Sequence, residues 1–102
     1  MFYQLGMYYP FFRAHTHIDY PNREPWLQTQ RVQTAIRDSI NRRYDLVHYI
    51  YTSFRYTTQT GVPFWRIMWN EFPEQSLFYE VASQFMLGDQ ILVAPKLTEP
   101  TA

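Results

Sequence analysis

The run TGVPFWRIMW, from Thr60 to Trp69, marks the point at which the pattern of the chain changes. Before it, apolar residues recur every three or four positions, and from Val62 onward they are continuous except for Arg66. The first pattern is typical of a helix with one buried face, and the second of a strand that is covered on both faces. Gly61 and Pro63 stand between them as a stop signal for the helix. The sequence therefore predicts a long helix followed by a buried strand.

The predicted helix runs from about residue 32 to residue 60, with Thr29 as its candidate N-cap. Its apolar stripe is expected to be buried and consists of Val32, Ile36, Ile40, Tyr44, Val47, Ile50 or Tyr51, and Phe54. The opposite face is expected to be solvated and carries Arg37, Asp38, Asn41, Arg42, Asp45 and Arg55.

Three further segments complete the predicted order of elements. QILVAP, residues 90–95, is expected to be a second buried strand, and FFRAHTHI, residues 11–18, a short strand that leads into a loop. Residues 74–87 have a weaker helical period, which Gly88 would end. The order strand, long helix, strand, short helix, strand predicts an α/β architecture with parallel strands. So few strands cannot cover both faces of a parallel sheet, and we therefore expect the chain to be a segment of a larger barrel or open sheet.

Composition excludes several classes of protein. Apolar residues make up 46% of the 102 residues and aromatic residues 20%, which is too much apolar surface for a disordered chain. Nine basic and nine acidic residues cancel, so nothing predicts binding to nucleic acid or to an anionic membrane. The sequence has no apolar run long enough for a membrane span. It also has no cysteine, which excludes a disulfide scaffold and a thiolate zinc site.

The stretch FFRAHTHID carries the main candidates for a functional site. If it is extended, Arg13, His15, His17 and Asp19 point to one face. A metal site, a sugar pocket and a plain solvated face all remain open at this point. The His15-x-His17 pair resembles the pair of histidines in metal-dependent amidohydrolases. A catalytic zinc needs a third strong ligand, however, and the remaining histidine, His48, lies inside the predicted helix.

Five blocks of the chain, in order, resemble the C-terminal part of the catalytic domain of glycoside hydrolase family 31. They are LGMYYPFFRAHTHID, REPW, IRDSINRRYDLVHYIYT, GVPFWRIMWNEFP and QFMLGDQILVAP. The resemblance implies the last part of a (β/α)8 TIM barrel in residues 1–87 and the start of a β-sandwich in residues 88–102. On this view Phe11 to His15 lie near the seventh strand of the barrel, where active sites of such barrels are found.

The resemblance also implies an activity, the retaining hydrolysis of terminal α-linked glucose from oligosaccharides. The family's aspartate nucleophile and its aspartate acid/base lie in blocks that this sequence does not contain, so we expect the chain alone to be inactive. No metal ion or other cofactor is implied. His15 is the expected glucose-binding residue, Arg13 its support, and Trp26, in the following loop, a wall of the pocket.

Within the family, RAHTH and REPW most resemble the members that trim N-glycan precursors. For those members the resemblance implies α-1,3-linked glucose, the lumen of the endoplasmic reticulum and a noncatalytic β subunit as partner; other members imply a secretory or lysosomal location. Two alternatives remain. One is a noncatalytic remnant that binds sugar, and the other is a metal-dependent amidohydrolase that uses His15 and His17.

Overall fold

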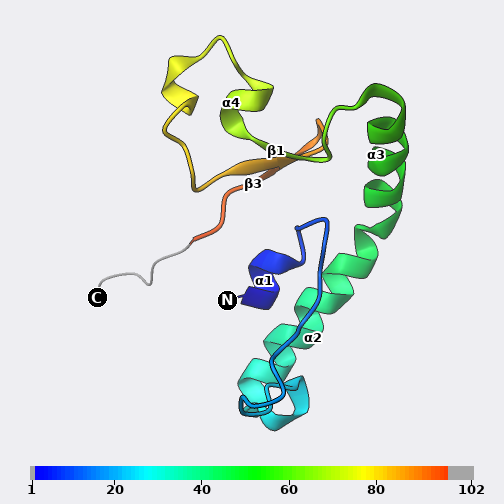
Figure 1. The fold of residues 1–102 in the computed structure, drawn as a ribbon, viewed down its shortest axis with the longest axis vertical. Helices are drawn as coiled ribbons and strands as arrows, with labels where there is room; N and C mark the ends of the chain where they lie inside the picture. Colours follow the sequence, from blue (N-terminus) through cyan, green and yellow to red (C-terminus); the bar gives the residue numbers. More distant parts are fainter. Residues whose placement is uncertain (1, 97–102) are drawn as a thin grey trace. The chain divides into compact units, whose positions relative to one another are not determined.

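The computed structural model describes residues 2–96. The chain divides into two compact units, and the boundary along the sequence lies between His48 and Tyr49. Its elements, drawn in Figure 1, are α1 (Phe2–Gly6), η1 (Pro25–Leu27), α2 (Gln30–Asp45), α3 (Val47–Thr60), β1 (Trp65–Ile67), α4 (Met68–Glu71), η2 (Ser76–Phe78), β2 (Phe85–Leu87) and β3 (Ile91–Val93). None of the helices in residues 2–96 is both long and apolar enough to span a bilayer.

The predicted long helix is confirmed, with one interruption. Thr29 is its N-cap, and the Gly61 amide ends it by donating to the carbonyl of Thr57 at 2.8 Å with a positive φ of 75°. The interruption is Leu46, whose amide is shared between the carbonyls of Arg42 and Tyr44. Sharing one donor between two acceptors disturbs the regular ladder of hydrogen bonds, so α2 and α3 are separate elements.

The buried face of α2 differs from the predicted stripe. Ile36 is buried as expected, but Tyr44 is 71% exposed, and the chain instead buries Ser39 and half-buries Arg43. Residues 36, 39 and 43 follow one another at helical steps of three and four, so they share one face. Hydropathy misplaced the stripe because two polar residues occupy this face. The opposite, charged face is solvated as predicted.

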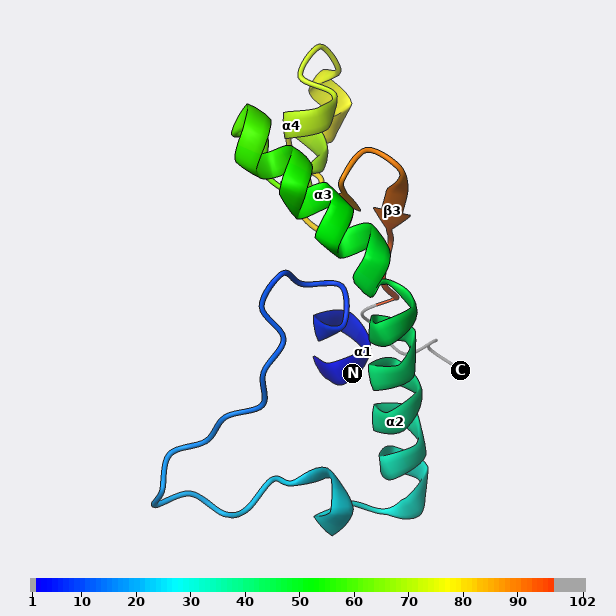
Figure 2. The same ribbon diagram turned by 90° about the vertical axis from the view of Figure 1, so that its right-hand side faces the viewer.

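The N-terminal unit consists of α1 packed on α2 and a long connection between them. Figure 2 shows α1 against the side of α2, and the chain swinging out after it before it returns to the start of α2. The short strand predicted within residues 11–18 is wrong, because these residues belong to no helix or strand. Within the described residues no second strand pairs with this segment, and a strand needs such a partner for its backbone groups.

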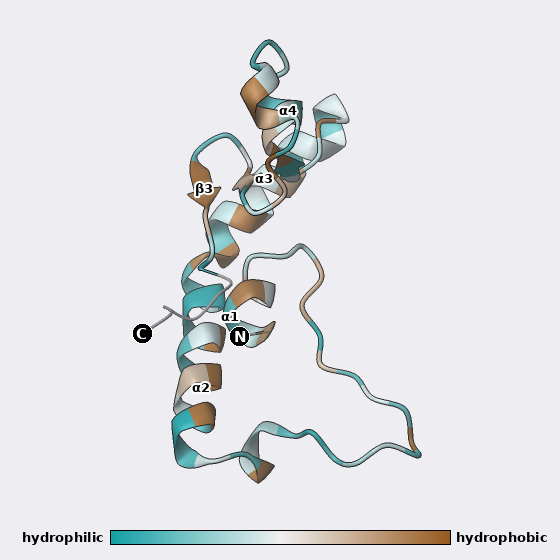
Figure 3. Ribbon diagram, turned by 90° about the vertical axis from the view of Figure 1, so that its left-hand side faces the viewer, coloured by the Kyte–Doolittle hydropathy of each residue, from teal (hydrophilic) through white to brown (hydrophobic). Residues whose placement is uncertain are grey.

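The sheet of the second unit is antiparallel, so the predicted parallel arrangement is wrong. Its strand order is β1-β2-β3, and Met86 at its centre pairs with Arg66 on one side and with Leu92 on the other. Strands β2 and β3 are joined by a tight turn at Gly88, which allows only an antiparallel pair. The strand predicted within residues 90–95 is confirmed as β3, which is hydrophobic (brown in Figure 3). The expected burial is found only at Val93, because Leu92 is 52% exposed.

The helix predicted over residues 74–87 is largely wrong. Only η2 is helical in this stretch, and Phe85 to Leu87 form the central strand β2, buried at all three positions. Leu87 has no exposed surface, and the core around it is formed by Phe64, Met68, Phe85, Met86 and Val93. The sequence of a strand with neighbours on both sides is a continuous apolar run. Periodicity alone cannot distinguish such a run from a buried helix.

The turn after β2 is fixed by a tyrosine on α3. The Tyr49 hydroxyl donates to the Leu87 carbonyl at 2.6 Å and accepts from the Gln90 amide at 3.3 Å. Gly88 lies between these contacts with a φ of 56°, and its amide donates to the Phe64 carbonyl at 2.7 Å. A Cβ atom at Gly88 would overlap the Tyr49 hydroxyl. Position 88 therefore needs glycine both for its conformation and for the space.

We expect Gly88→Ala to destabilise the protein more than Gly61→Ala. Both glycines have positive φ, but a Cβ at Gly61 would meet open space. The left-handed conformation costs alanine about 1 kcal/mol at either position, and the overlap with Tyr49 should add about 1–3 kcal/mol at Gly88. Denaturant unfolding of the two variants measures the difference. Equal losses would contradict the contact with Tyr49.

Candidate functional site

The course of the chain before the candidate site is set by Arg43 of α2. Its Nη1 donates to the carbonyls of Met7 and Tyr9 at 2.9 and 2.6 Å, and its Nη2 donates to the Pro10 carbonyl at 3.0 Å. Burial lowers the pKa of the guanidinium from its usual value. Hydrogen bonds from a charged donor are about twice as strong as neutral ones. Arg43 thus ties the turn after α1 to α2.

The same segment lines a pocket of about 580 Å³ in the N-terminal unit. This volume is within the range of small-molecule sites. One part of its wall is aromatic and comes from Phe2, Tyr3, Tyr9, Phe11 and Phe12. Another part is polar and comes from Arg13, His15, Thr16, Arg23 and Glu24. Apolar walls with a few polar groups suit a ligand that has both CH surface and hydroxyls.

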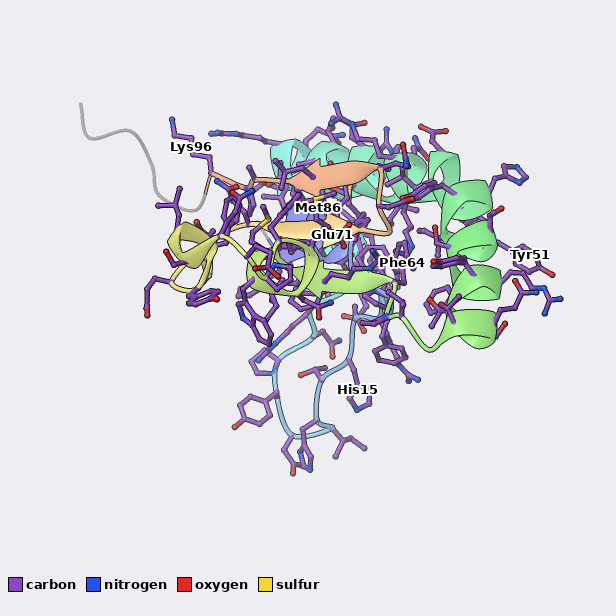
Figure 4. All side chains as sticks on the ribbon, turned by 90° about the horizontal axis from the view of Figure 1, so that it is seen from above. His15, Tyr51, Phe64, Glu71, Met86 and Lys96 are labelled. Atoms are coloured by element: carbon purple, nitrogen blue, oxygen red, sulfur yellow. The ribbon has the colours of Figure 1, made fainter. Side chains whose placement is uncertain are left out.

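Of the three residues predicted for the site, two lie together in this pocket. His15 and Arg13 both line it, and His15 is carried by the irregular segment after α1 (Figure 4). A neutral imidazole can donate from one nitrogen and accept at the other, and a guanidinium offers five donors, so both suit sugar hydroxyls. Trp26 is in η1 and 71% exposed; its neighbour Pro25 lines the pocket, whereas Trp26 is not among the lining residues.

His17 and Asp19 form a local pair. The Asp19 amide donates to His17 Nδ1 at 3.2 Å, and the Asp19 carboxylate lies 3.2 Å from the same nitrogen. Both side chains are largely exposed. Within residues 2–96 no group of three His, Cys, Asp or Glu side chains is arranged to hold a metal ion. The histidine pair therefore has no third ligand in this part of the chain.

Glu24 is a residue of the pocket that the sequence reading did not single out. One of its carboxylate oxygens, Oε2, is buried and has no hydrogen-bond partner within residues 2–96. The neighbouring guanidinium of Arg23 lies over the Tyr20 ring, 5.7 Å from its centroid. The only signal in the sequence was the block REPW, in which Glu24 stands before Pro25.

Glu71, in the second unit, differs from Glu24 because its carboxylate has a charged partner. It accepts a hydrogen bond from Arg66 Nη1 at 2.7 Å, and Arg66 Nε donates to the Pro63 carbonyl at 2.7 Å. Arg66 is only 8% exposed. The sequence left Glu71 and Asp89 open as its partner, and the structure selects Glu71 because α4 begins directly after β1 and turns this side chain back.

Two family descriptions match the chain. Residues 1–53 match the glycosyl hydrolases family 31 TIM-barrel domain, and residues 61–102 match the glycosyl hydrolase family 31 C-terminal domain. The boundary predicted at residue 87 between the barrel and sandwich parts stays a prediction.

Several curated proteins are similar to nearly the whole chain. Neutral alpha-glucosidase AB of Mus musculus is 45% identical over 91% of the chain. A probable glucan 1,3-alpha-glucosidase of Arabidopsis thaliana is 46% identical over 97%, and the glucosidase 2 subunit alpha of Saccharomyces cerevisiae is 41% identical over 96%. The matches cover only 10%, 11% and 10% of these relatives, so the chain spans about a tenth of their length.

Glu24 and Glu71, both partly buried, give a matched test of how much a charged partner contributes to stability. Glu71→Gln should lower the free energy of unfolding by about 3 kcal/mol, because it leaves the Arg66 charge buried without its partner. Glu24→Gln should change it by less than about 1 kcal/mol, because the buried oxygen Oε2 has no hydrogen bond to lose within residues 2–96. Thermal and denaturant unfolding measure both. A loss at Glu24 as large as that at Glu71 would contradict the unpaired state of Glu24.

Proposed function

Because the chain belongs to glycoside hydrolase family 31, we propose that it forms one wall of the active site of a retaining α-glucosidase. The observation that carries the proposal is the match of both family domain descriptions. The shared position of His15 and Arg13 on one pocket supports it, because the family resemblance implies a sugar-binding role for the histidine of this motif.

The proposed roles of the residues follow from their chemistry. His15 exchanges hydrogen bonds with two hydroxyls of the glucose that is cleaved off, as donor with one nitrogen and acceptor with the other. Arg13 donates to a further hydroxyl or holds a carbonyl that orients the site. The exposed ring of Trp26, next to Pro25, is a wall for the part of an oligosaccharide that extends beyond the pocket.

In a retaining mechanism one carboxylate attacks the anomeric carbon, and a second carboxyl group protonates the leaving oxygen and then activates water. The resemblance assigns both to blocks outside this chain. The task of the residues present here is therefore to bind and orient the sugar. Positioning of this kind lowers the barrier because the reacting atoms are already close and aligned.

The substrate class is proposed more narrowly as glucose in α-1,3 linkage on N-glycan precursors. One plant relative carries the name glucan 1,3-alpha-glucosidase, and the yeast relative is by name the alpha subunit of glucosidase 2. A noncatalytic β subunit as partner and the lumen of the endoplasmic reticulum as location belong to the same proposal.

The activity is tested on the complete gene product with an α-1,3-linked glucose disaccharide. Proton NMR of the first turnovers should show the α-anomer of glucose, because two inversions at the anomeric carbon give net retention. The 102-residue chain by itself is the control and should show no turnover. Release of the β-anomer, or no cleavage by the complete product, would sink the proposal.

His15→Ala in the complete gene product should lower kcat/KM on an aryl α-glucoside by about 10- to 100-fold, as expected for the loss of one or two hydrogen bonds to the substrate. His17→Ala is the matched control, since it removes an imidazole two residues away whose contacts are local, with Asp19 and with the Tyr20 ring. Its kcat/KM should stay within about twofold of the parent. Equal effects of the two variants would remove His15 from the site.

A further inference from the structure

The turn after α1 is anchored by a charged side chain, Arg43. All three carbonyls held by Arg43 lie between Met7 and Pro10, on a turn 33 to 36 residues earlier in the chain. A continuous stretch of the pocket wall, residues 11–16, follows this turn directly, and residues 12–16 belong to no helix or strand. A segment without the regular backbone hydrogen bonds of a helix or strand takes its course from the points at which other residues hold it.

Phe12 provides a second link between Arg43 and the pocket. The Arg43 guanidinium carbon lies 5.9 Å from the centroid of the Phe12 ring, within the range of a cation–π contact. The same ring packs edge-on against Tyr3 at 6.0 Å, and a Cβ at Gly6 would approach it to 3.3 Å. Phe12 is thus confined on several sides. It also lines the pocket and immediately precedes Arg13.

We propose that Arg43 is a positioning residue of the sugar site: it holds the turn from Met7 to Pro10 and the Phe12 ring so that Arg13 and His15 keep their places in the pocket. The inference rests on the proposed function. It extends the site to a residue of α2 that does not line the pocket. Arg43 acts on the substrate only through the wall that it holds.

Lysine cannot replace Arg43 in this role. An ammonium group is a point charge, whereas the planar guanidinium directs several donors at once in a fixed geometry. Three carbonyls at 2.6–3.0 Å from two nitrogens require that geometry. Arg43→Lys keeps the charge and much of the stem, so it tests the directed hydrogen bonds. Arg42→Lys makes the same chemical change at the adjacent, exposed position and is the matched control.

The experiment is a double-mutant cycle in the complete gene product, measured as kcat/KM on an aryl α-glucoside. Arg43→Lys should lower it by about tenfold or more, because small displacements of binding groups are costly, and Arg42→Lys should leave it within about twofold. In the His15→Ala background Arg43→Lys should have less than about a twofold further effect, because the group that it positions is gone. Independent effects that multiply, or equal effects of the two lysine variants, would overturn the proposal.

Two further measurements keep the inference testable. If Arg43→Lys does not fold, Phe12→Leu takes its place in the cycle, with about a threefold or larger loss that also disappears in the His15→Ala background. If the complete product has no α-glucosidase activity, the proposed function fails, and hydrogen exchange of the Met7, Tyr8 and Tyr9 amides, which are hydrogen-bonded in the anchored turn, then tests the anchor. Exchange should be about tenfold faster in Arg43→Lys than in Arg42→Lys. Equal exchange would overturn the positioning role itself.

Discussion

The guanidinium of Arg43 is the constraint on which the N-terminal unit depends. A cation that is partly withdrawn from water must be hydrogen-bonded, and so must the carbonyls of an irregular turn. Arg43 meets both requirements at once, because it donates to Met7, Tyr9 and Pro10. Arg43 thereby holds three neighbouring parts of the chain to one face of α2: the short helix α1, the turn after it, and the stretch of pocket wall that follows the turn. A side chain that hydropathy assigns to the surface organises this unit.

In the second unit, too, a side chain binds backbone groups of an irregular turn, but here the side chain is neutral. The Tyr49 hydroxyl bridges the Leu87 carbonyl and the Gln90 amide, and the close approach of its ring requires glycine at position 88. Arg66 similarly satisfies the Pro63 carbonyl while it pairs with Glu71. Three strands of only three residues each keep their register because side chains secure the backbone at their ends.

The pocket and the family membership complement each other. The family match names the chemistry, and the pocket shows which residues of this chain are near one another: His15 and Arg13 share a lining with aromatic rings and with Glu24. His17 and Asp19, which made the alternating pattern conspicuous, pair with each other at 3.2 Å.

Large aromatic side chains such as Tyr51 remain exposed among the described residues, and Tyr51 points outward (Figure 4).

The sequence by itself determined the features whose cause is local. The helical period predicted a helix over about residues 32–60, and Gly61 predicted its end. The apolar run predicted β3, and the quoted blocks predicted the family. Tertiary structure decided which face of α2 is buried, that Phe11 to His15 form no strand, that Phe85 to Leu87 do, and that the sheet is antiparallel. The reason is physical: pairing and burial depend on partners distant in the sequence. A half-buried arginine such as Arg43 becomes recognisable only once the carbonyls that accept its hydrogen bonds are in place.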